Sequence, residues 1–326
     1  MIIGFWYWCT DQYIVQRVLS GRSQKEARRG SIFAGYLKLL PVFIFLIPGM
    51  IAFTLYQKGL LTLPLNAQGT GPDADKAFSS LVAQFLPIGL KGVVVCGLLA
   101  ALMSSLASLF NSSAALFVGD FYKKMKPNAS EKHYVTIGRI ATAAVVILGV
   151  VWIPVMKGMG NVLYRYLQAV QGLLAPAIAG AFILGVFWKR ANWIGNLWGM
   201  TLGFVLGMFR LLLDVIIGGP IAKAQSLAEA EKLARIAEIK EQFGFLYTLE
   251  TINWLYICEG LLVISVAVTI IVSLLTKAPE SGKLKFTYYK ATPEEKAATR
   301  ASWGAWDVIH TLIIIAVVVV FYMYFW

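Results

Sequence analysis

The chain has 326 residues, of which 58% are hydrophobic and only 14% are charged, and its mean hydropathy is +0.69. A soluble domain is nearer half apolar and a quarter charged, so this composition excludes an ordinary globular protein and predicts an all-α, polytopic membrane protein. The formal net charge of +12 does not indicate a nucleic-acid partner, because the basic residues lie in polar connections between apolar runs, where they signal membrane topology.

The first seventeen residues, MIIGFWYWCTDQYIVQR, combine an aromatic cluster, a polar patch and a basic end. Four consecutive aromatic residues, 5–8, are followed by Thr10, Asp11 and Gln12. This order suits a membrane helix that faces a polar pathway. At most about 19 residues, Met1 to Leu19, are available, so the segment is predicted to be a marginal membrane crossing.

Seven further apolar segments are each long enough to cross about 30 Å of hydrocarbon as a helix. With the opening segment they make about eight spans, the later ones being 32–56, 89–121, 134–156, 161–187, 193–217, 251–275 and 305–326. Helical spacing also predicts a short surface helix at 73–85 and a charged amphipathic helix outside the membrane at about 221–243.

The distribution of lysine and arginine between the connections predicts the orientation. Alternate connections hold seventeen of the 29 basic residues, and the opposite connections hold seven. By the positive-inside rule, the richer set is cytoplasmic and the C-terminus is extracytoplasmic. The predicted cytoplasmic loops are 20–31, 122–133, 188–192 and 276–303. We expect a multi-pass protein of the cell membrane, in a bacterium the inner membrane, with the lipid bilayer as its surroundings.

Lys38 is a charged residue seven positions into the second predicted span. Charge in the hydrocarbon region costs roughly 2.5–3.5 kcal/mol by insertion scales, so such residues are rare and worth weighing. Lys38 either extends its amine back to the cytoplasmic surface or faces a central cavity, where it meets a carboxylate or a polar ligand.

Ala101, Ser104 and Ser105 stand at positions i, i+3 and i+4 and so share one face of the third predicted span. Two serine hydroxyls and a nearby carbonyl are hard oxygen donors that suit an alkali cation better than a transition metal. The alternative is that these small residues allow close helix packing, as is common in membranes.

Gln168 lies near the start of the fifth predicted span, one turn before Gln171. Its amide can hydrogen-bond either a sugar hydroxyl or another helix. We find no nucleophile and base pair, phosphate-binding loop or metal motif in the sequence, and we therefore expect a protein that is not an enzyme and has no cofactor.

Four motifs together resemble one family of transporters. They are WYWCTDQYIVQR, GYLKLLPVFIFLIPGMIA, LLAALMSSLASLFNSSAALFVGDFYKK, and YLQAVQGLLAP followed by GVFWKRAN. In their order and spacing they are similar to the sodium/glucose cotransporter branch of the solute:sodium symporters. The resemblance runs from Gly4 to about Leu213 and continues more weakly to the end.

The resemblance implies a LeuT-like core of two inverted repeats with helices broken at the midplane. This chain is expected to begin inside the broken helix that opens the second repeat, as a truncated gene model or fragment lacking the first repeat. Residues 1–190 would then be the partial core, and residues 191–326 peripheral transmembrane helices.

The resemblance also implies roles for seven residues. Tyr7 matches an aromatic gate beneath the bound sugar, with Trp8 beside it, and Lys38 and Gln168 match sugar-contacting residues. For the coupling ion, the resemblance implies sodium bound by the Ala101 carbonyl and the hydroxyls of Ser104 and Ser105, with the other half of that site on the missing repeat.

Two positions depart from the family pattern. Gly4 stands where relatives have asparagine or threonine near the sugar, so one hydrogen bond is expected to be lost. Arg165 stands where some relatives have an aspartate tied to a second sodium, which favours a stoichiometry of one sodium; the alternative is that Arg165 simply faces the outer water.

The expected function is therefore sodium-coupled symport of a glucose- or galactose-like sugar by alternating access. The alternatives are symport of another polar solute, such as inositol, sialic acid or another polyol, and a membrane sensor of the same fold without net transport. A third possibility is that the fragment alone has no activity.

Overall fold

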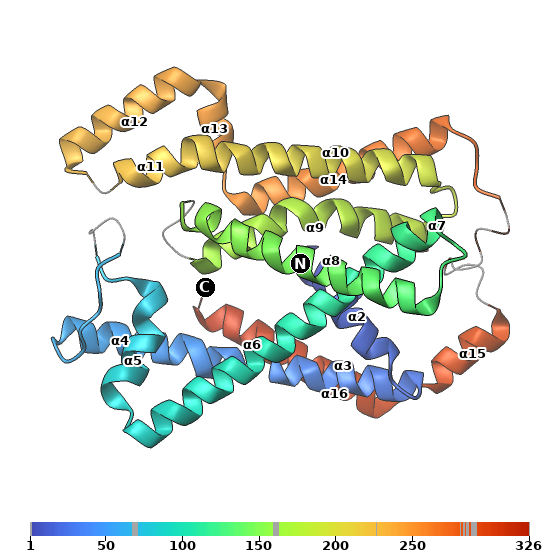
Figure 1. Cartoon of the computed structure of the whole chain (residues 1–326), viewed down its shortest axis with the longest axis horizontal. Coiled ribbons are helices and arrows are strands. Elements are labelled where there is room, and N and C mark those ends of the chain that lie inside the picture. Colours follow the sequence, from blue (N-terminus) through green and yellow to red (C-terminus); the bar gives the residue numbers. More distant parts are fainter. Residues whose placement is uncertain are drawn as a thin grey trace. The chain divides into compact units, whose positions relative to one another are not determined.

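The computed structural model describes residues 2–66, 71–158, 163–225, 227–280 and 292–325, together with 282, 284 and 287. Helices dominate this part of the chain, and its one extended pairing is an isolated bridge between Leu65 and Pro72. Seven of the described helices are long and apolar enough to cross a membrane (Figure 1). They are Gln24–Gln57, Ile88–Met125, Glu131–Pro154, Tyr166–Phe187, Trp193–Ala224, Trp254–Leu275 and Ala305–Tyr324.

These helices carry most of their apolar side chains on the outside. In the best 18-residue window of Ile88–Met125, none of the residues is buried, and in Ala305–Tyr324 only 6% are. Apolar surface on this scale is unfavourable in water and favourable against lipid. The predicted class, an all-α polytopic membrane protein, is confirmed.

The opening segment differs from the single marginal crossing that we expected. It forms two short helices, α1 (Ile2–Cys9) and α2 (Gln12–Leu19), separated at Thr10 and Asp11. Each has eight residues, or about 12 Å of helix, which is too short to cross a bilayer. Two local side-chain hydrogen bonds stabilise this break. The Thr10 hydroxyl donates to the Trp6 carbonyl at 2.7 Å, and the Asp11 carboxylate accepts from the Tyr13 amide at 3.2 Å and so caps α2.

The next helix starts before the predicted span 32–56, which corrects the predicted loop 20–31. Ser23 accepts from the Glu26 amide at 3.2 Å and caps α3 (Gln24–Leu37). The helix is then interrupted at residues 38–39, and Pro41 lacks the amide that a regular helix would use there. A π-helical turn, η1 (Val42–Leu46), leads into α4 (Ile47–Gln57). Lys38 therefore lies at an irregular point rather than inside a regular span.

The chain forms two compact units. Unit 1 contains Met1–Pro48, Leu167–Leu213 and Thr248–Trp326, and unit 2 contains Gly49–Tyr166 and Asp214–Tyr247. This division concerns contact density within the described chain. The predicted boundary at residue 190 between a transporter core and peripheral helices is a different kind of division and stays a prediction.

Unit 1 contains three closely packed helices, α9 (Leu163–Phe187), α10 (Trp193–Leu213) and α14 (Trp254–Leu275). Glycines at every fourth position of α10 let its backbone approach α14 and α9, and α10 and α14 run side by side in Figure 1. The four glycines are Gly195, Gly199, Gly203 and Gly207, and all are buried.

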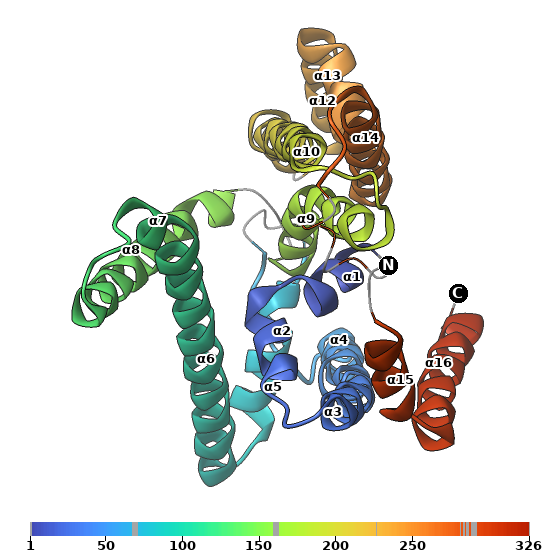
Figure 2. The same ribbon diagram turned by 90° about the vertical axis from the view of Figure 1, so that its right-hand side faces the viewer.

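Two further helices of unit 1 follow α14. The predicted cytoplasmic loop 276–303 is corrected, because it contains α15 (Pro293–Ala301), whose Thr292 and Glu295 form a reciprocal capping box. The last helix, α16 (Ala305–Phe325), packs against α3, and Figure 2 shows the two adjacent to each other.

Unit 2 is built on the packed pair α6 (Ile88–Leu116) and α8 (Glu131–Gly158). The predicted surface helix at 73–85 is present. The predicted helix at 221–243 is interrupted, because its first part belongs to the crossing helix Trp193–Ala224. Besides α6, α8 and most of α4, unit 2 contains η2 (Ala74–Lys76), α5 (Ala77–Phe85), η3 (Phe117–Tyr122), α7 (Lys123–Met125), η4 (Asp214–Gly218), α11 (Gly219–Ala224), α12 (Glu229–Phe243) and the start of α13 (Phe245–Thr251), which continues into unit 1.

Candidate functional site

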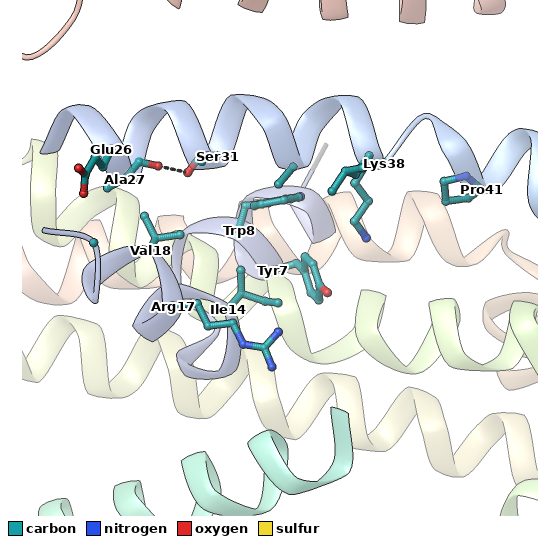
Figure 3. A pocket seen from close by; sticks show the side chains of 14 residues that line it. Tyr7, Trp8, Ile14, Arg17, Val18, Glu26, Ala27, Ser31, Lys38 and Pro41 are labelled. Atoms are coloured by element: carbon teal, nitrogen blue, oxygen red, sulfur yellow. Dashed lines mark hydrogen bonds between the residues drawn. The ribbon is translucent and has the colours of Figure 1, made fainter. Parts of the chain in front are cut away.

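A cavity of about 630 Å³ lies within unit 1, between the two short opening helices and α3 (Figure 3). It is of the size that small-molecule sites in proteins usually have. Its walls come from α1, α2, the turn after α2, and the full length of α3. They are Tyr7, Trp8, Ile14, Arg17, Val18, Gly21, Glu26, Ala27, Gly30, Ser31, Ala34, Leu37, Lys38 and Pro41.

Small residues on α3 make room for this cavity. Ala27, Gly30, Ser31 and Ala34 recur at spacings of three and four, so they share one helix face. The Ser31 hydroxyl donates to the Ala27 carbonyl at 2.9 Å, which keeps it folded against its own helix. A long side chain at any of these positions would fill the space between α3 and the opening helices.

Aromatic rings from α1 and the Lys38 amine meet at one end of the cavity. The Lys38 Nζ lies 5.0 Å from the centre of the Tyr7 ring and 6.0 Å from the Trp8 ring. The two rings are edge-to-face, with their centres 5.9 Å apart. Figure 3 shows the Lys38 side chain extending from the end of α3 toward them. A cation over an aromatic face is attracted to it, which fixes the amine beside the rings.

The irregular backbone at Lys38 helps to place its amine. The Leu39 amide bonds the Tyr36 carbonyl at 3.0 Å, a tighter turn than that of a regular helix. The side chain leaves the helix where this turn and Pro41 interrupt it. Lys38 thus lines the cavity, and its predicted contact with a polar ligand stays a prediction.

The electrostatic character of the cavity is basic with one carboxylate. Lys38 and Arg17 supply two positive charges to the wall, and Glu26 supplies a negative one. The Arg17 guanidinium lies 4.6 Å from the centre of the Tyr13 ring. Such a site offers several donors and aromatic faces to a polar, uncharged molecule with many hydroxyl groups.

The structure brings together three of the four residues predicted to contact solute. Tyr7, Trp8 and Lys38 line the same cavity, whereas Gln168 lies on α9 in the same unit and is not part of that wall. Gln168 is half-buried. Its predicted role stays a prediction.

The three residues predicted to hold an ion lie on one face of α6 in unit 2. Ala101, Ser104 and Ser105 are all exposed. The Ser104 carbonyl accepts the Ser108 hydroxyl at 3.1 Å, and the Ser112 hydroxyl in turn bonds the Ser108 carbonyl at 2.8 Å. The neighbouring hydroxyls are thus partly used along the helix. Exposure of the face is compatible with an ion whose remaining ligands come from another segment.

Of the two predicted departures, only Gly4 can be assessed. It is exposed on α1, and nothing lies within 4 Å of where a Cβ would stand, so the position has room for a side chain. The side chain of Arg165 lies outside the described residues. Within the described chain, no group of three or more histidine, cysteine, aspartate or glutamate side chains could hold a metal ion.

Several wall residues were missed by the sequence analysis. Arg17 was considered only as part of the basic end of the opening segment, and Ala27, Gly30 and Ser31 were assigned to the loop 20–31. The signal for them was present, because AxxGSxxA has the spacing of one helix face. Arg28 and Arg29, which lie inside the pattern, favoured a loop and obscured it.

The fold and the cavity define a multi-pass membrane protein with a wall suited to a small polar molecule. The model of the sodium:solute symporter family matches residues 1–203. The chain therefore belongs to the sodium:solute symporter family, as the resemblance predicted.

Similar proteins carry more specific names. The chain is 42% identical to sodium/myo-inositol cotransporter 2 of Oryctolagus cuniculus over 225 residues, which is 67% of this chain and 33% of the relative. It is 33% identical to sodium/glucose cotransporter 4 of Danio rerio over 318 residues, 93% of this chain and 45% of the relative. It is 34% identical to a sodium/mannose cotransporter of Bos taurus, covering 99% of this chain and 54% of the relative. The chain thus spans between about a third and a half of these relatives' lengths.

Proposed function

We propose that this chain forms part of a sodium-coupled symporter for a six-membered ring polyol, with a glucose- or galactose-like sugar as the first candidate. The observation that carries the proposal is the meeting of Tyr7, Trp8 and Lys38 in one cavity. Aromatic rings offer apolar contact to the C–H faces of a sugar ring, and an ammonium group donates up to three hydrogen bonds to its hydroxyls. Gln168 is proposed to add an amide from α9.

The named solutes of the relatives support the class rather than one member. Glucose, mannose and myo-inositol are all six-membered rings with several hydroxyl groups, and they occur in the names of the three relatives. Inositol is the second candidate for this chain because the relative with 42% identity is named for it. Sialic acid and other polyols remain alternatives of the same transport class.

Sodium is proposed to bind the α6 face formed by the Ala101 carbonyl and the hydroxyls of Ser104 and Ser105. Exposed, hard oxygen atoms on one helix face support this assignment. Coupling requires that sodium and solute each bind one conformation better than another. In that scheme, sodium stabilises the outward-open state, solute binds next, and both leave on the cytoplasmic side, where the basic connections are proposed to lie.

The test is equilibrium binding of labelled glucose, galactose and myo-inositol to the purified chain in proteoliposomes, in sodium and in choline. Binding should depend on sodium. Lys38→Ala should weaken solute binding at least about tenfold, or roughly 1.4 kcal/mol, because it removes the amine from the cavity. The matched control is Lys58→Ala, which removes the same charge from an exposed position after α4.

A second variant distinguishes an effect on sodium binding from an effect on solute binding. Ser105→Ala should raise the sodium concentration needed for half-maximal binding while leaving solute affinity at saturating sodium unchanged. Equal binding in sodium and choline would refute symport by this chain. Equal effects of Lys38→Ala and Lys58→Ala would refute the cavity as the solute site.

A further inference from the structure

A second hollow in unit 1 lies between α3 and α16, on membrane-spanning helices and away from Lys38. This α3–α16 groove has a volume of about 480 Å³. Its apolar side is formed mainly by Ile32, Val308, Leu312, Ile314 and Ile315. Its polar end is formed by Arg28, Ser31, Asp307 and Thr311, with Trp303 beside it.

The two helices run in the same direction, so their polar ends coincide. Arg28, near the start of α3, donates through Nη1 to the Ser302 hydroxyl at 2.7 Å, just before α16. Further along, the Tyr36 hydroxyl lies 2.8 Å from Nδ1 of His310. The groove therefore has a charged end and an apolar end, as an amphiphilic molecule does.

Most polar groups at the charged end already have partners. The Ser31 and Thr311 hydroxyls bond carbonyls of their own helices, at 2.9 and 2.8 Å. Asp307 accepts from the Gly304 amide at 2.9 Å and pairs with Arg29 at 3.4 Å. Arg29 is thereby neutralised, whereas the Arg28 charge is left without a carboxylate within ion-pair distance in the described chain.

The net charge at this end is therefore positive. Two guanidinium groups face one carboxylate, and Lys25 stands three residues before Arg28 on the same face of α3. An arginine guanidinium has five donors and matches the geometry of phosphate oxygens. The charge complement of this end is an anion.

The membrane setting of the groove indicates which kind of anion binds at this end. Both walls belong to helices that are candidates for crossing a membrane, and in each only 6% of the most apolar window is buried. Leu312 and Ile315 are 58% and 52% exposed, so in a bilayer they meet acyl chains. The exposed tryptophans Trp303 and Trp306 mark this level as the interface between headgroups and hydrocarbon. Basic pockets between membrane helices are places where anionic lipid headgroups bind.

We propose that the α3–α16 groove binds one anionic phospholipid, with its phosphate on Arg28 and an acyl chain along Ile32, Leu312 and Ile315. The lipid covers the apolar side of the groove and neutralises its excess charge at the same time. This proposal is independent of the transported solute, because neither Arg28 nor the apolar residues that would hold the lipid line the cavity around Lys38 or belong to the α6 face; Ser31 lines both hollows, but its hydroxyl is bonded to the Ala27 carbonyl.

The test is native mass spectrometry of the detergent-purified 326-residue protein with phosphatidylglycerol or phosphatidylcholine of identical acyl chains. Phosphatidylglycerol should be retained at about tenfold lower lipid concentration than phosphatidylcholine, and Arg28→Gln should remove that difference. The matched control is Arg22→Gln, which makes the same charge change at an exposed residue outside the groove and should keep the preference. Leu312→Trp fills the apolar side without changing charge and should weaken retention of phosphatidylglycerol, with helical content checked by circular dichroism.

Each other result overturns the proposal. Equal retention of the two lipids by the wild-type protein shows that the phosphate end has no role. Equal losses in Arg22→Gln and Arg28→Gln show a diffuse surface charge. Displacement of phosphatidylglycerol by excess inorganic phosphate shows a site for a free anion, and a dimer mass that disappears in Leu312→Trp shows that a second copy of the chain occupies the groove.

Discussion

The glycines of α10 provide a prediction whose size follows directly from the structure. A Cβ at Gly199 would lie 2.0 Å from the Thr269 hydroxyl and 2.7 Å from the Ser265 carbonyl oxygen of α14. The hydroxyl can rotate away, although it would then lose its 2.8 Å bond to that same carbonyl. The backbone carbonyl cannot rotate. To reach ordinary contact at 3.4 Å, α14 would have to retreat by about 0.7 Å along a closely packed interface.

Gly199→Ala should therefore destabilise the protein despite the better helix propensity of alanine. Forcing a methyl group into a packed interface costs about 1–3 kcal/mol, and the lost hydroxyl bond costs about 0.5–1.5 kcal/mol. Alanine returns about 1 kcal/mol of helix propensity. The net expectation is a loss of about 0.5–3.5 kcal/mol, or roughly 2- to 400-fold in the unfolding equilibrium.

The assay is reversible unfolding in mixed micelles at increasing mole fraction of sodium dodecyl sulfate, followed by circular dichroism. Gly260→Ala on α14 is the matched control, because nothing lies within 4 Å of its Cβ position. That control should be neutral or stabilising, so the two variants are expected to differ in sign. A Gly199→Ala protein as stable as Gly260→Ala would refute the packing argument.

Two other contacts of unit 1 give predictions of their own. The Arg210 and Glu250 side chains form a buried ion pair, with exposed fractions of 9% and 8%. Glu250→Gln should therefore lower the unfolding free energy by about 3–5 kcal/mol, because it leaves a buried charge unpaired. In the same unfolding assay, the double variant Arg210→Met/Glu250→Met should recover most of that loss, and no recovery would contradict the reasoning. Asn192 caps α10 through the Gly195 amide at 2.8 Å and bonds the Thr276 hydroxyl at 2.6 Å. Asn192→Ala should lower the unfolding free energy by about 1–3 kcal/mol, and Asn192→Ser, which can still cap the helix, should restore part of it, whereas identical midpoints for the two variants would exclude capping as the cause.

The membrane class and most crossing helices could be predicted from sequence, because about twenty consecutive apolar residues have few alternatives to a membrane helix. The ends of the helices were harder to predict from the sequence. Polar and charged residues at 20–31 suggested a loop, but Ser23 caps α3 there and extends the helix outward. Likewise, the polar connection 276–303 was predicted as a loop but contains α15, whose start is stabilised by the capping box of Thr292 and Glu295.

The candidate site was predictable where motif and position coincide. Tyr7, Trp8 and Lys38 were singled out from the sequence, and they meet in one cavity. The walls that create the volume could not be predicted, because small residues on α3 become a wall only when another segment lies opposite them. The roles predicted for Tyr7, Trp8 and Lys38 remain predictions, as do those of Gln168 and the Ser104–Ser105 face, because each role depends on the ligand that the residue meets.

The sequence by itself determined that this chain is a helical membrane protein of the sodium:solute symporter family, because composition, apolar length and long motifs are properties of the chain alone. The tertiary structure decided which helices approach closely and which of the described charges form ion pairs. The stripe of four glycines on α10 acquires its meaning only against the Ser265 and Thr269 groups of α14. Arg28 and Arg29 are adjacent and chemically identical in the sequence, but Asp307, 278 positions after Arg29, pairs with Arg29, whereas Arg28 has no carboxylate within ion-pair distance among the described residues.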